Sequence, residues 1–374
     1  MEIYIYYGFF FLLLVCLIVQ LYYLIVFQNK FRVYKVKEAA ANASEEPVSV
    51  IVCARNESEN LSKFLPEILN QDYPLYEVIV VNDCSVDDSE DVLRVFQSRY
   101  SNLKVLKLTE HPRFKTGKKF ALTLGIKAAS NQNLLLTDAD CLPASKEWIS
   151  LMTRHYTNEQ TRIVLGYSPY QKTKGILNAL IRYETFQTAL NYFSFALNGM
   201  PYMGVGRNLS YKKPLFFEGK GFAAHMHIPS GDDDLFVNQN ATEANTVIEV
   251  SPASHVWSEP KQSWASFWKQ KTRHMGASKM YKSNHKLNLS LQAISAMGFY
   301  LFLLLCAVFK VELVALIVVF MLRLGTQLFI YYKSAEKLRT KDLLWWLIIL
   351  DPFYYIYLIT VSIAHLFIKK MTWK

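Results

Sequence analysis

The chain has 374 residues, of which 52% are hydrophobic and 14% aromatic, and its formal net charge is +10. This apolar content is high for a soluble protein and predicts membrane segments. Much of the positive charge lies beside the apolar segments and no nucleic-acid-binding motif is present, so we expect a membrane partner and no nucleic acid. The five scattered cysteines include no CxxC pair, which argues against a disulfide framework and a zinc site.

The first element is an uncharged apolar run over residues 4–27, about the length that crosses a bilayer. It is too long for the core of a signal peptide and lacks a small-residue cleavage site. Basic residues follow it between positions 30 and 37, whereas Glu2 is the only charge before it, so the positive-inside rule places the next domain in the cytoplasm. We expect a transmembrane helix within 1–29, a polar linker over 30–46, and an integral protein of the plasma membrane.

Strands and helices alternate across the region 47–286, which predicts an α/β domain with a mostly parallel, Rossmann-like sheet. Polar residues follow the ends of several predicted strands, where open α/β sheets bind their ligands. These residues are Arg55, Asp83, Lys118, Asp138 and Asp140. The expected strands are 48–52, 78–81, 105–108 and a fourth beginning at 134, and the expected helices are 59–69, 87–100 and 120–129.

Two carboxylates one residue apart, Asp138 and Asp140, end the apolar stretch Leu134–Cys141. Residues i and i+2 of an extended chain face the same side, so both acids can point at one object. Oxygen ligands suit Mg²⁺ or Mn²⁺, and such an ion would in turn hold a substrate diphosphate. The alternative is a solvated acidic turn, since Asp is common in turns.

A second acidic cluster, Asp232–Asp234, lies in the sequence Ser-Gly-Asp-Asp-Asp-Leu. Three adjacent acids repel one another, which raises the pKa of at least one of them when they are partly buried. A carboxylate with a raised pKa suits a general base near neutral pH. A helix N-terminus capped by one of the three is the alternative, and the two readings are compatible.

Four segments in order, VSVIVCARNE, VIVVNDCSVDD, GKKFAL and LLLTDADCLP, resemble the nucleotide-binding half of family 2 glycosyltransferases with the GT-A fold. The resemblance covers roughly residues 47–275. It implies sugar transfer from a nucleotide-sugar to an acceptor hydroxyl, with inversion of configuration and with Mg²⁺ or Mn²⁺ as cofactor. Cys53 replaces a usual Pro and Cys84 a usual Gly, which leaves the nucleotide base undefined.

The resemblance also implies roles for individual residues. Asp138 and Asp140 would hold the metal and the diphosphate, and the remaining donor contacts would be Arg55, Glu57, Asp83 and Lys118. The second acidic cluster resembles the family motif that supplies the catalytic base. The Gly-Asp-Asp frame favours Asp233 as that base, whereas counting back from Leu235 favours Asp232.

Two further motifs resemble family elements. Gln270 and Arg273 match a Q-x-x-R-W motif of cellulose and hyaluronan synthases, with His274 in place of the Trp that contacts the acceptor. We expect Gln270 near the donor, Arg273 neutralising the leaving diphosphate as a catalytic group, and His274 near the acceptor. A glycine-rich loop ending in Arg207 and Asn208 resembles a family loop of the acceptor region.

The region 174–198 has apolar residues at helical spacing, typical either of core packing or of an interfacial helix near the acceptor entrance. Trp257, Trp264 and Trp268 suit either sugar stacking or anchoring at the membrane interface.

The carboxyl-terminal region 287–374 returns to the membrane, with expected spans near 289–309, 313–332 and 343–368. The last of these contains Asp351-Pro352, and an acid within a span is costly unless it faces protein or water. This stretch fits either one kinked span or a hairpin.

Membrane segments on both sides of the α/β domain point to a lipid or lipid-linked glycan as the acceptor of the sugar. One alternative is a processive polysaccharide synthase, against which stand His274 and the small number of spans. The other is an inactive membrane scaffold that only binds nucleotide, against which stand the two intact acidic clusters.

Overall fold

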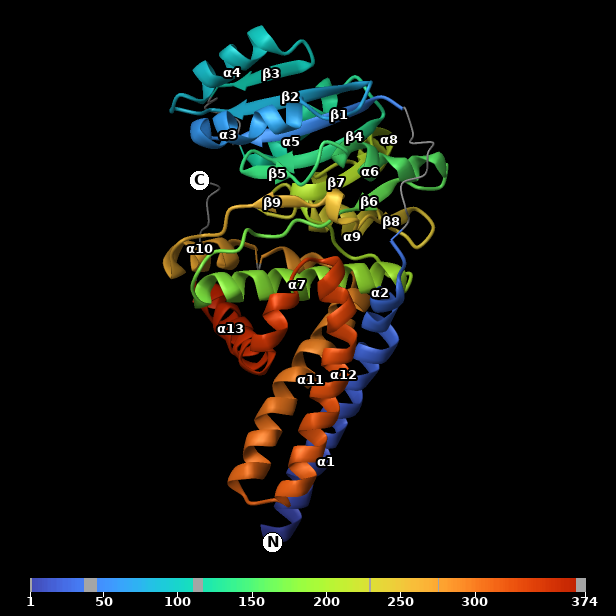
Figure 1. Ribbon diagram of the computed structural model, residues 1–374, viewed down its shortest axis with the longest axis vertical. Coiled ribbons are helices and arrows are strands. Elements are labelled where there is room, and N and C mark those ends of the chain that lie inside the picture. Colours follow the sequence, from blue (N-terminus) through green and yellow to red (C-terminus); the bar gives the residue numbers. More distant parts are fainter. Residues whose placement is uncertain (1, 37–45, 110–116, 229, 275, 368–374) are drawn as a thin grey trace.

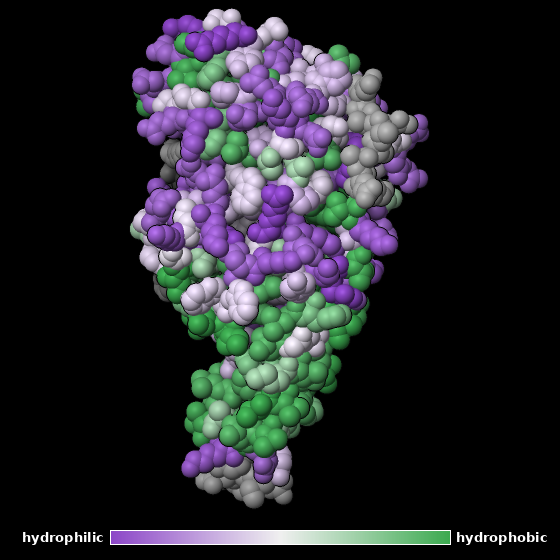
Figure 2. All heavy atoms as spheres, viewed as in Figure 1, coloured by the Kyte–Doolittle hydropathy of each residue, from purple (hydrophilic) through white to green (hydrophobic). Residues whose placement is uncertain are grey.

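The computed structural model describes residues 2–36, 46–109, 117–228, 230–274 and 276–367, with the backbone alone at 2–6, 273–274 and 365–367. An α/β domain lies at one end of the molecule and a stalk of long helices at the other (Figure 1). The visible surface of the stalk is apolar, whereas that of the α/β domain is mostly hydrophilic (Figure 2).

The α/β domain is built on a seven-stranded sheet in the order β3-β2-β1-β4-β7-β6-β8. Strands β3, β2, β1 and β4 are parallel, and β7 runs antiparallel to both β4 and β6. The predicted mostly parallel sheet is therefore confirmed. The strands are β1 Val48–Ala54, β2 Tyr76–Asp83, β3 Leu103–Leu108, β4 Asn133–Asp138, β6 Ile163–Leu165, β7 Leu209–Lys212 and β8 Thr246–Ile248.

Helices cover both faces of this sheet, which is why its central strands are continuous apolar runs. Helix α5 packs on the face of Ile51, and α3 and α6 pack on the face of Val50. Gly125 permits the close approach of α5, since a Cβ atom there would come within 2.8 Å of Ile51. The helices are α3 Ser58–Leu69, α4 Ser89–Arg99, α5 Lys118–Ala128, α6 Trp148–Thr153, α8 Lys213–Glu218 and α9 Asp234–Asn240.

Three elements of the second half complete the domain. The short strands β5 and β9 pair antiparallel beside the main sheet, and α10 follows them. Helix α7 lies between the α/β domain and the stalk (Figure 1). Their bounds are β5 Cys141–Pro143, β9 Val256–Ser258, α7 Ile176–Leu197 and α10 Trp264–His274.

Four helical segments are long and apolar enough to cross a membrane among the residues that the structure describes. Helices α1, α11 and α12 run side by side in the stalk, and α13 lies beneath α7 (Figure 1). The bounds are α1 Glu2–Tyr22, a π-helical turn η1 Tyr23–Gln28, α2 Asn29–Val33, α11 Ser283–Val308, α12 Leu313–Lys337, a 3₁₀ segment η7 Lys341–Trp346 and α13 Leu347–Phe367.

The structure extends several predicted boundaries. The first helical segment continues past residue 29 to Val33, because Phe31 is fully buried and stacks on Phe193 of α7. Lys337 carries α12 beyond the predicted residue 332 and donates to the carbonyls of Phe31 and Arg32 at 2.6 and 2.8 Å. These bonds satisfy carbonyls at the end of α2 that have no partner within the helix.

The last apolar stretch forms one helix through Asp351 and Pro352, so the hairpin alternative is wrong for the described residues. Helix α7 fits the core-packing reading of its sequence pattern, and the interfacial reading stays a prediction. Most of its residues are buried in the core, and it lies where the α/β domain meets the stalk. Much of the predicted linker, residues 37–45, lies outside the described part of the chain.

Candidate active site

A pocket of about 1200 Å³ opens at the carboxyl ends of β1 and β4 and extends between α7 and α10 as far as α13. Parallel strands bring the residues that follow them to the same edge of the sheet. The pocket therefore collects predicted site residues from distant parts of the sequence. Those that line it are Arg55, Glu57, Lys118, Asp138, Asp140, Arg207, Asp232, Asp233 and Gln270.

Lys118 joins the two acidic clusters. It begins α5, and its Nζ lies 2.9 Å from Asp138 Oδ1 and 3.0 Å from Asp232 Oδ2. Burial alone would lower the pKa of Lys118, but Asp138, Asp232 and Asp233 raise it well above its ordinary value. Lys118 is therefore a charged group that holds both clusters in one site.

Asp138 ends β4, and Asp140 lies in the turn before β5. Burial, followed by repulsion from Asp138, raises the pKa of Asp140, whereas the positive charge of Arg207 lowers it. The pair thus carries negative charge that is only partly balanced by the side chains around it. A hard divalent cation could bind here, because carboxylate oxygens are its preferred ligands.

The three acids of the second cluster have different partners. Asp233 caps α9, since its Oδ1 accepts from the amide of Asp234 at 2.8 Å and its Oδ2 from the amide of Gly206 at 2.7 Å. Asp234 accepts from the hydroxyl of Tyr281 at 2.7 Å. Asp232, in contrast, contacts the side chain of Lys118.

The pKa values of the cluster follow from these contacts. Burial raises the pKa of Asp233, and repulsion from Asp232 adds to it. Burial and repulsion from Asp233 raise the pKa of Asp234 to about 7. Burial would also raise the pKa of Asp232, but the ammonium group of Lys118 outweighs it, so that pKa is lowered. The expectation that at least one of the three has a raised pKa is confirmed.

Arg207 and Asn208 are adjacent in sequence but have different surroundings. The guanidinium of Arg207 lies 4.4 Å from the ring centroid of Tyr170 and lines the pocket. Asn208 is fully buried, accepts from Trp148 at 3.0 Å, and donates to the carbonyls of Tyr167 and Ser254. It therefore supports the loop from behind, and its predicted contact with the acceptor does not fit this burial.

The predicted nucleoside contacts lie at the ends of β1 and β2. Arg55 Nη1 is 3.8 Å from Asp83 Oδ2, and Asp83 is fully buried. Glu57 accepts from the side chain of Asn60 at 2.6 Å and faces the pocket. Arg55 and Glu57 are placed to contact a ligand, with Asp83 next to Arg55, and the nucleoside itself stays a prediction.

Helix α10 forms the side of the pocket opposite α7. Gln270 lies on its pocket face together with two tryptophans, Trp264 and Trp268. Arg273 and His274 belong to the last turn of α10, but their side chains lie outside the described part of the chain. Their predicted roles beside the diphosphate and the acceptor therefore stay predictions.

Comparisons with known proteins show the family to which the chain belongs. The family model described as Glycosyl transferase family group 2 matches residues 134–363, more than half of the chain, and that described as Glycosyl transferase family 2 matches residues 49–209. The chain belongs to the family 2 glycosyltransferases.

Individual relatives agree with this assignment. The glycosyltransferase is 27% identical over 276 residues to the probable glycosyltransferase YdaM of Bacillus subtilis, which is 68% of this chain and 62% of YdaM. It is 36% identical over 141 residues to the glycosyltransferase AglE of Haloferax volcanii, which is 37% of this chain and 44% of AglE. The matched region thus spans less than two thirds of the length of these relatives.

The fold of this glycosyltransferase is shared with a mannosyltransferase of Pyrobaculum calidifontis, PcManGT, solved in complex with GDP-Man and Mn²⁺. The TM-score is 0.64, with 17% sequence identity, and the superposition covers 96% of this chain and 99% of PcManGT. The predicted GT-A fold is therefore confirmed.

Several residues of the glycosyltransferase pocket were not predicted from the sequence. Glu184 of α7 accepts from Lys271 of α10 at 2.5 Å, and both residues line the pocket. Beyond it the pocket reaches Tyr357, Leu358 and Val361 of α13. For Glu184, the available sequence signal was the position of a charged residue among the apolar, buried residues of α7. Nothing local marks α13 as a pocket wall, because its residues are those of any apolar helix.

Proposed function

We propose that this protein transfers a sugar from a nucleotide-sugar donor to the hydroxyl of a lipid or lipid-linked acceptor. The observation that carries this proposal is the extent of the pocket. One end holds the two acidic clusters, and the other is lined by Leu358 and Val361 of an apolar helix long enough to cross a membrane. An acceptor with an apolar chain can therefore lie along α13 while its polar end reaches Asp232.

The donor would occupy the edge of the sheet. Arg55 and Glu57 follow β1 and line the pocket, where they can contact the nucleoside, and Asp83, the buried last residue of β2, lies beside Arg55. Lys118 lies between the two acidic clusters, so it can approach the phosphates. Gln270, which lines the pocket, would contact the donor from α10, and Arg273 of the same motif would approach the diphosphate.

Asp138 and Asp140 would hold a divalent cation, Mg²⁺ or Mn²⁺. The fit rests on two pocket-lining carboxylates one residue apart, of which Asp140 is partly buried and has its pKa raised first by burial and then by the negative charge of Asp138. A cation between them would remove this repulsion. The Mn²⁺ in the complex of PcManGT, which shares the fold, supports the same choice. When bound, the ion would stabilise negative charge on the leaving diphosphate.

Asp232 is the better candidate for the general base. Both carboxylate oxygens of Asp233 accept backbone amide hydrogens, and those of Asp234 accept from Leu235 and Tyr281. Asp232 lines the pocket, and the ammonium group of Lys118 lowers its pKa and so keeps its carboxylate ionised, the form that can take a proton. The raised pKa expected of the base from the sequence belongs instead to Asp233 and Asp234.

In the proposed reaction Asp232 takes the proton of the acceptor hydroxyl. The acceptor oxygen then forms a bond to the anomeric carbon of the donor sugar, and the bond from this carbon to the diphosphate oxygen breaks. Attack from the face opposite the leaving group inverts the configuration of the sugar. Lys118 and Arg273 can balance negative charge that develops on the nucleoside diphosphate.

We place the α/β domain in the cytoplasm, with the stalk in the plasma membrane. Lys30, Arg32 and Lys35 follow the apolar part of the first helix, as the positive-inside rule requires of a cytoplasmic flank. Nucleotide-sugars would reach the sheet edge from the same side.

A donor screen tests this function. Full-length protein, purified in detergent, is mixed with a panel of nucleotide-sugars, a membrane lipid extract and either Mn²⁺ or Mg²⁺, and nucleotide release and lipid labelling are measured. We expect one donor to give both signals only with metal, and NMR of the product to show inverted anomeric configuration.

Two variants test the proposed metal site in the same assay. Asp140→Asn should lower turnover by about 100-fold, because charge stabilisation at the diphosphate is lost. Asp91→Asn, which changes an exposed acid of α4 far from the pocket, is the matched control and should behave as wild type. Unchanged turnover in Asp140→Asn would contradict the metal site, and absence of release with every donor would contradict the enzyme.

A further inference from the structure

We infer that Asp351 of α13, held by Arg323 of α12, is a positioning residue that fixes α7 as the acceptor-side wall of the pocket. This inference rests on the proposed function. It adds a link between the buried charges of the membrane helices and the place where the acceptor is held.

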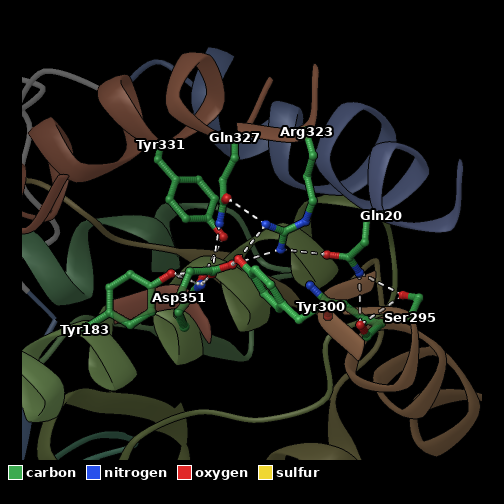
Figure 3. A network of polar contacts seen from close by, with 10 residues as sticks. Gln20, Tyr183, Ser295, Tyr300, Arg323, Gln327, Tyr331 and Asp351 are labelled. Carbon is green, nitrogen blue, oxygen red and sulfur yellow. Dashed lines mark hydrogen bonds and ion pairs between the residues drawn. The ribbon is translucent and has the colours of Figure 1, made fainter. Parts of the chain in front are cut away.

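One face of helix α7 lines the pocket, and another contacts the membrane helices. Residues spaced along one stripe line the pocket, and these are Glu184, Thr185, Thr188, Ala189 and Tyr192. Tyr183 lies on the neighbouring stripe and points toward the membrane helices (Figure 3), and Gln187, one turn later, accepts from the hydroxyl of Tyr331 of α12. A rotation or shift of α7 on its membrane side therefore moves the pocket side by the same amount.

Asp351 is the acceptor at the centre of this contact. Its Oδ1 accepts from the hydroxyl of Tyr183 at 2.6 Å, and its Oδ2 accepts from Tyr300 at 2.5 Å and from Arg323 at 2.9 Å. Gln187 strengthens the tie from α7, since its Nε2 donates to the oxygen of Tyr183 at 2.7 Å. Figure 3 shows Tyr183, Tyr300 and Arg323, from α7, α11 and α12, converging on the carboxylate of Asp351.

Arg323 fixes the carboxylate in turn. It donates to Tyr300 at 2.9 Å, to Gln327 at 3.2 Å and to Gln20 of α1 at 3.3 Å. Side-chain exposure is 3% for Arg323 and 1% for Asp351, and a charge buried to this degree in an apolar setting needs its partners in place. The network therefore has little freedom to rearrange, which suits a fixed reference point.

Association of the membrane helices alone would not require the contacts to α7. Polar side chains do hold membrane helices together, and Gln20, Tyr300 and Arg323 suffice for that. Tyr183 and Gln187 come from a helix of the α/β domain, and the polar groups of both form hydrogen bonds within this network. Arg182, one residue earlier, forms a two-pronged ion pair with Asp342 of η7 at 2.8 and 2.7 Å. The same end of α7 is thus fastened twice to the membrane region.

Two conservative variants separate positioning from simple stability. Tyr183→Phe removes the hydroxyl that ties α7 to Asp351, whereas Tyr300→Phe removes a hydroxyl that binds the same carboxylate from α11. Both delete one oxygen from a tyrosine, and neither residue lines the pocket. In vesicles of defined lipid, KM for the acceptor and KM for the donor are measured with each full-length variant.

We expect Tyr183→Phe to raise KM for the acceptor about tenfold, the size set by one lost hydrogen bond to a charged group, with KM for the donor unchanged. Hydrogen exchange of the α7 amides should quicken in this variant and not in Tyr300→Phe. Equal acceptor kinetics in the two variants, or unchanged kinetics in the double variant Tyr183→Phe with Gln187→Leu, would overturn the inference. Wild-type protein without any transferase activity would instead count against the proposed function.

Discussion

The ammonium nitrogen of Lys118 lies 3.0 Å from the carboxylate of Asp232, and its second ion-pair partner is Asp138 at 2.9 Å. The residue that joins the metal-binding candidate to the candidate base is thus a single, partly buried lysine at the start of α5. Its positive charge lowers the cost of holding the carboxylates close together.

Replacement of this lysine by a neutral side chain should disable the donor site. In Lys118→Met the carboxylates of Asp138 and Asp232 lose their shared cation and repel one another, so we expect kcat/KM for the donor to fall by about 100-fold. Steady-state nucleotide release measures this. Lys127→Met changes an exposed lysine in the last turn of the same helix and should leave the kinetics unaltered. Equal values for the two variants would show that the bridge has no catalytic role.

The two candidate bases can be distinguished by isosteric variants. Asp232→Asn should lower sugar transfer by about 100-fold to 10,000-fold, as removal of a general base does, while calorimetry still detects donor binding. Asp233→Asn keeps an oxygen that can cap α9, so transfer should fall far less. The reverse order of the two effects would assign the base to Asp233.

Acid should weaken the folded state through His255. Burial lowers the pKa of this histidine to about 4, and its Nε2 lies 3.3 Å from the carbonyl oxygen of Val250. At pH values below the ordinary histidine pKa of about 6.5, the unfolded chain binds a proton at His255 that the folded chain does not bind. The folded state therefore loses stability as the pH falls from about 6.5 to about 4. The full loss from this residue is about 3 kcal/mol.

Thermal unfolding of detergent-solubilised protein at several pH values within this range tests the prediction. The unfolding midpoint of wild type should drop as pH falls, and that of His255→Gln should drop less steeply. The remaining slope in the variant would come from other groups, such as buried His225, whose pKa burial also lowers to about 4. Parallel slopes for both proteins would exclude His255 as a source.

Much of the fold was predictable because it follows from local patterns. Strand β1 is mostly apolar and β4 ends in Asp138, so both the parallel core and the position of the acids at its edge followed from sequence. The clusters at Asp138 and Asp232 were identifiable for the same reason, since carboxylates that are close together in the sequence by themselves indicate a metal site or a general base. Asn208 was misread because its motif marks a loop but does not say which side chain faces the ligand.

The amino-acid sequence by itself determined the α/β sheet, the apolar helices and the residue types of the site, because periodicity and composition act over a few neighbouring residues. Only the tertiary structure decided that Asp233 caps a helix while Asp232 pairs with Lys118, and that Tyr183 of α7 meets Asp351 of α13. These partners lie more than a hundred residues apart, except for the helix cap. Such contacts depend on how whole elements pack, which no local pattern specifies.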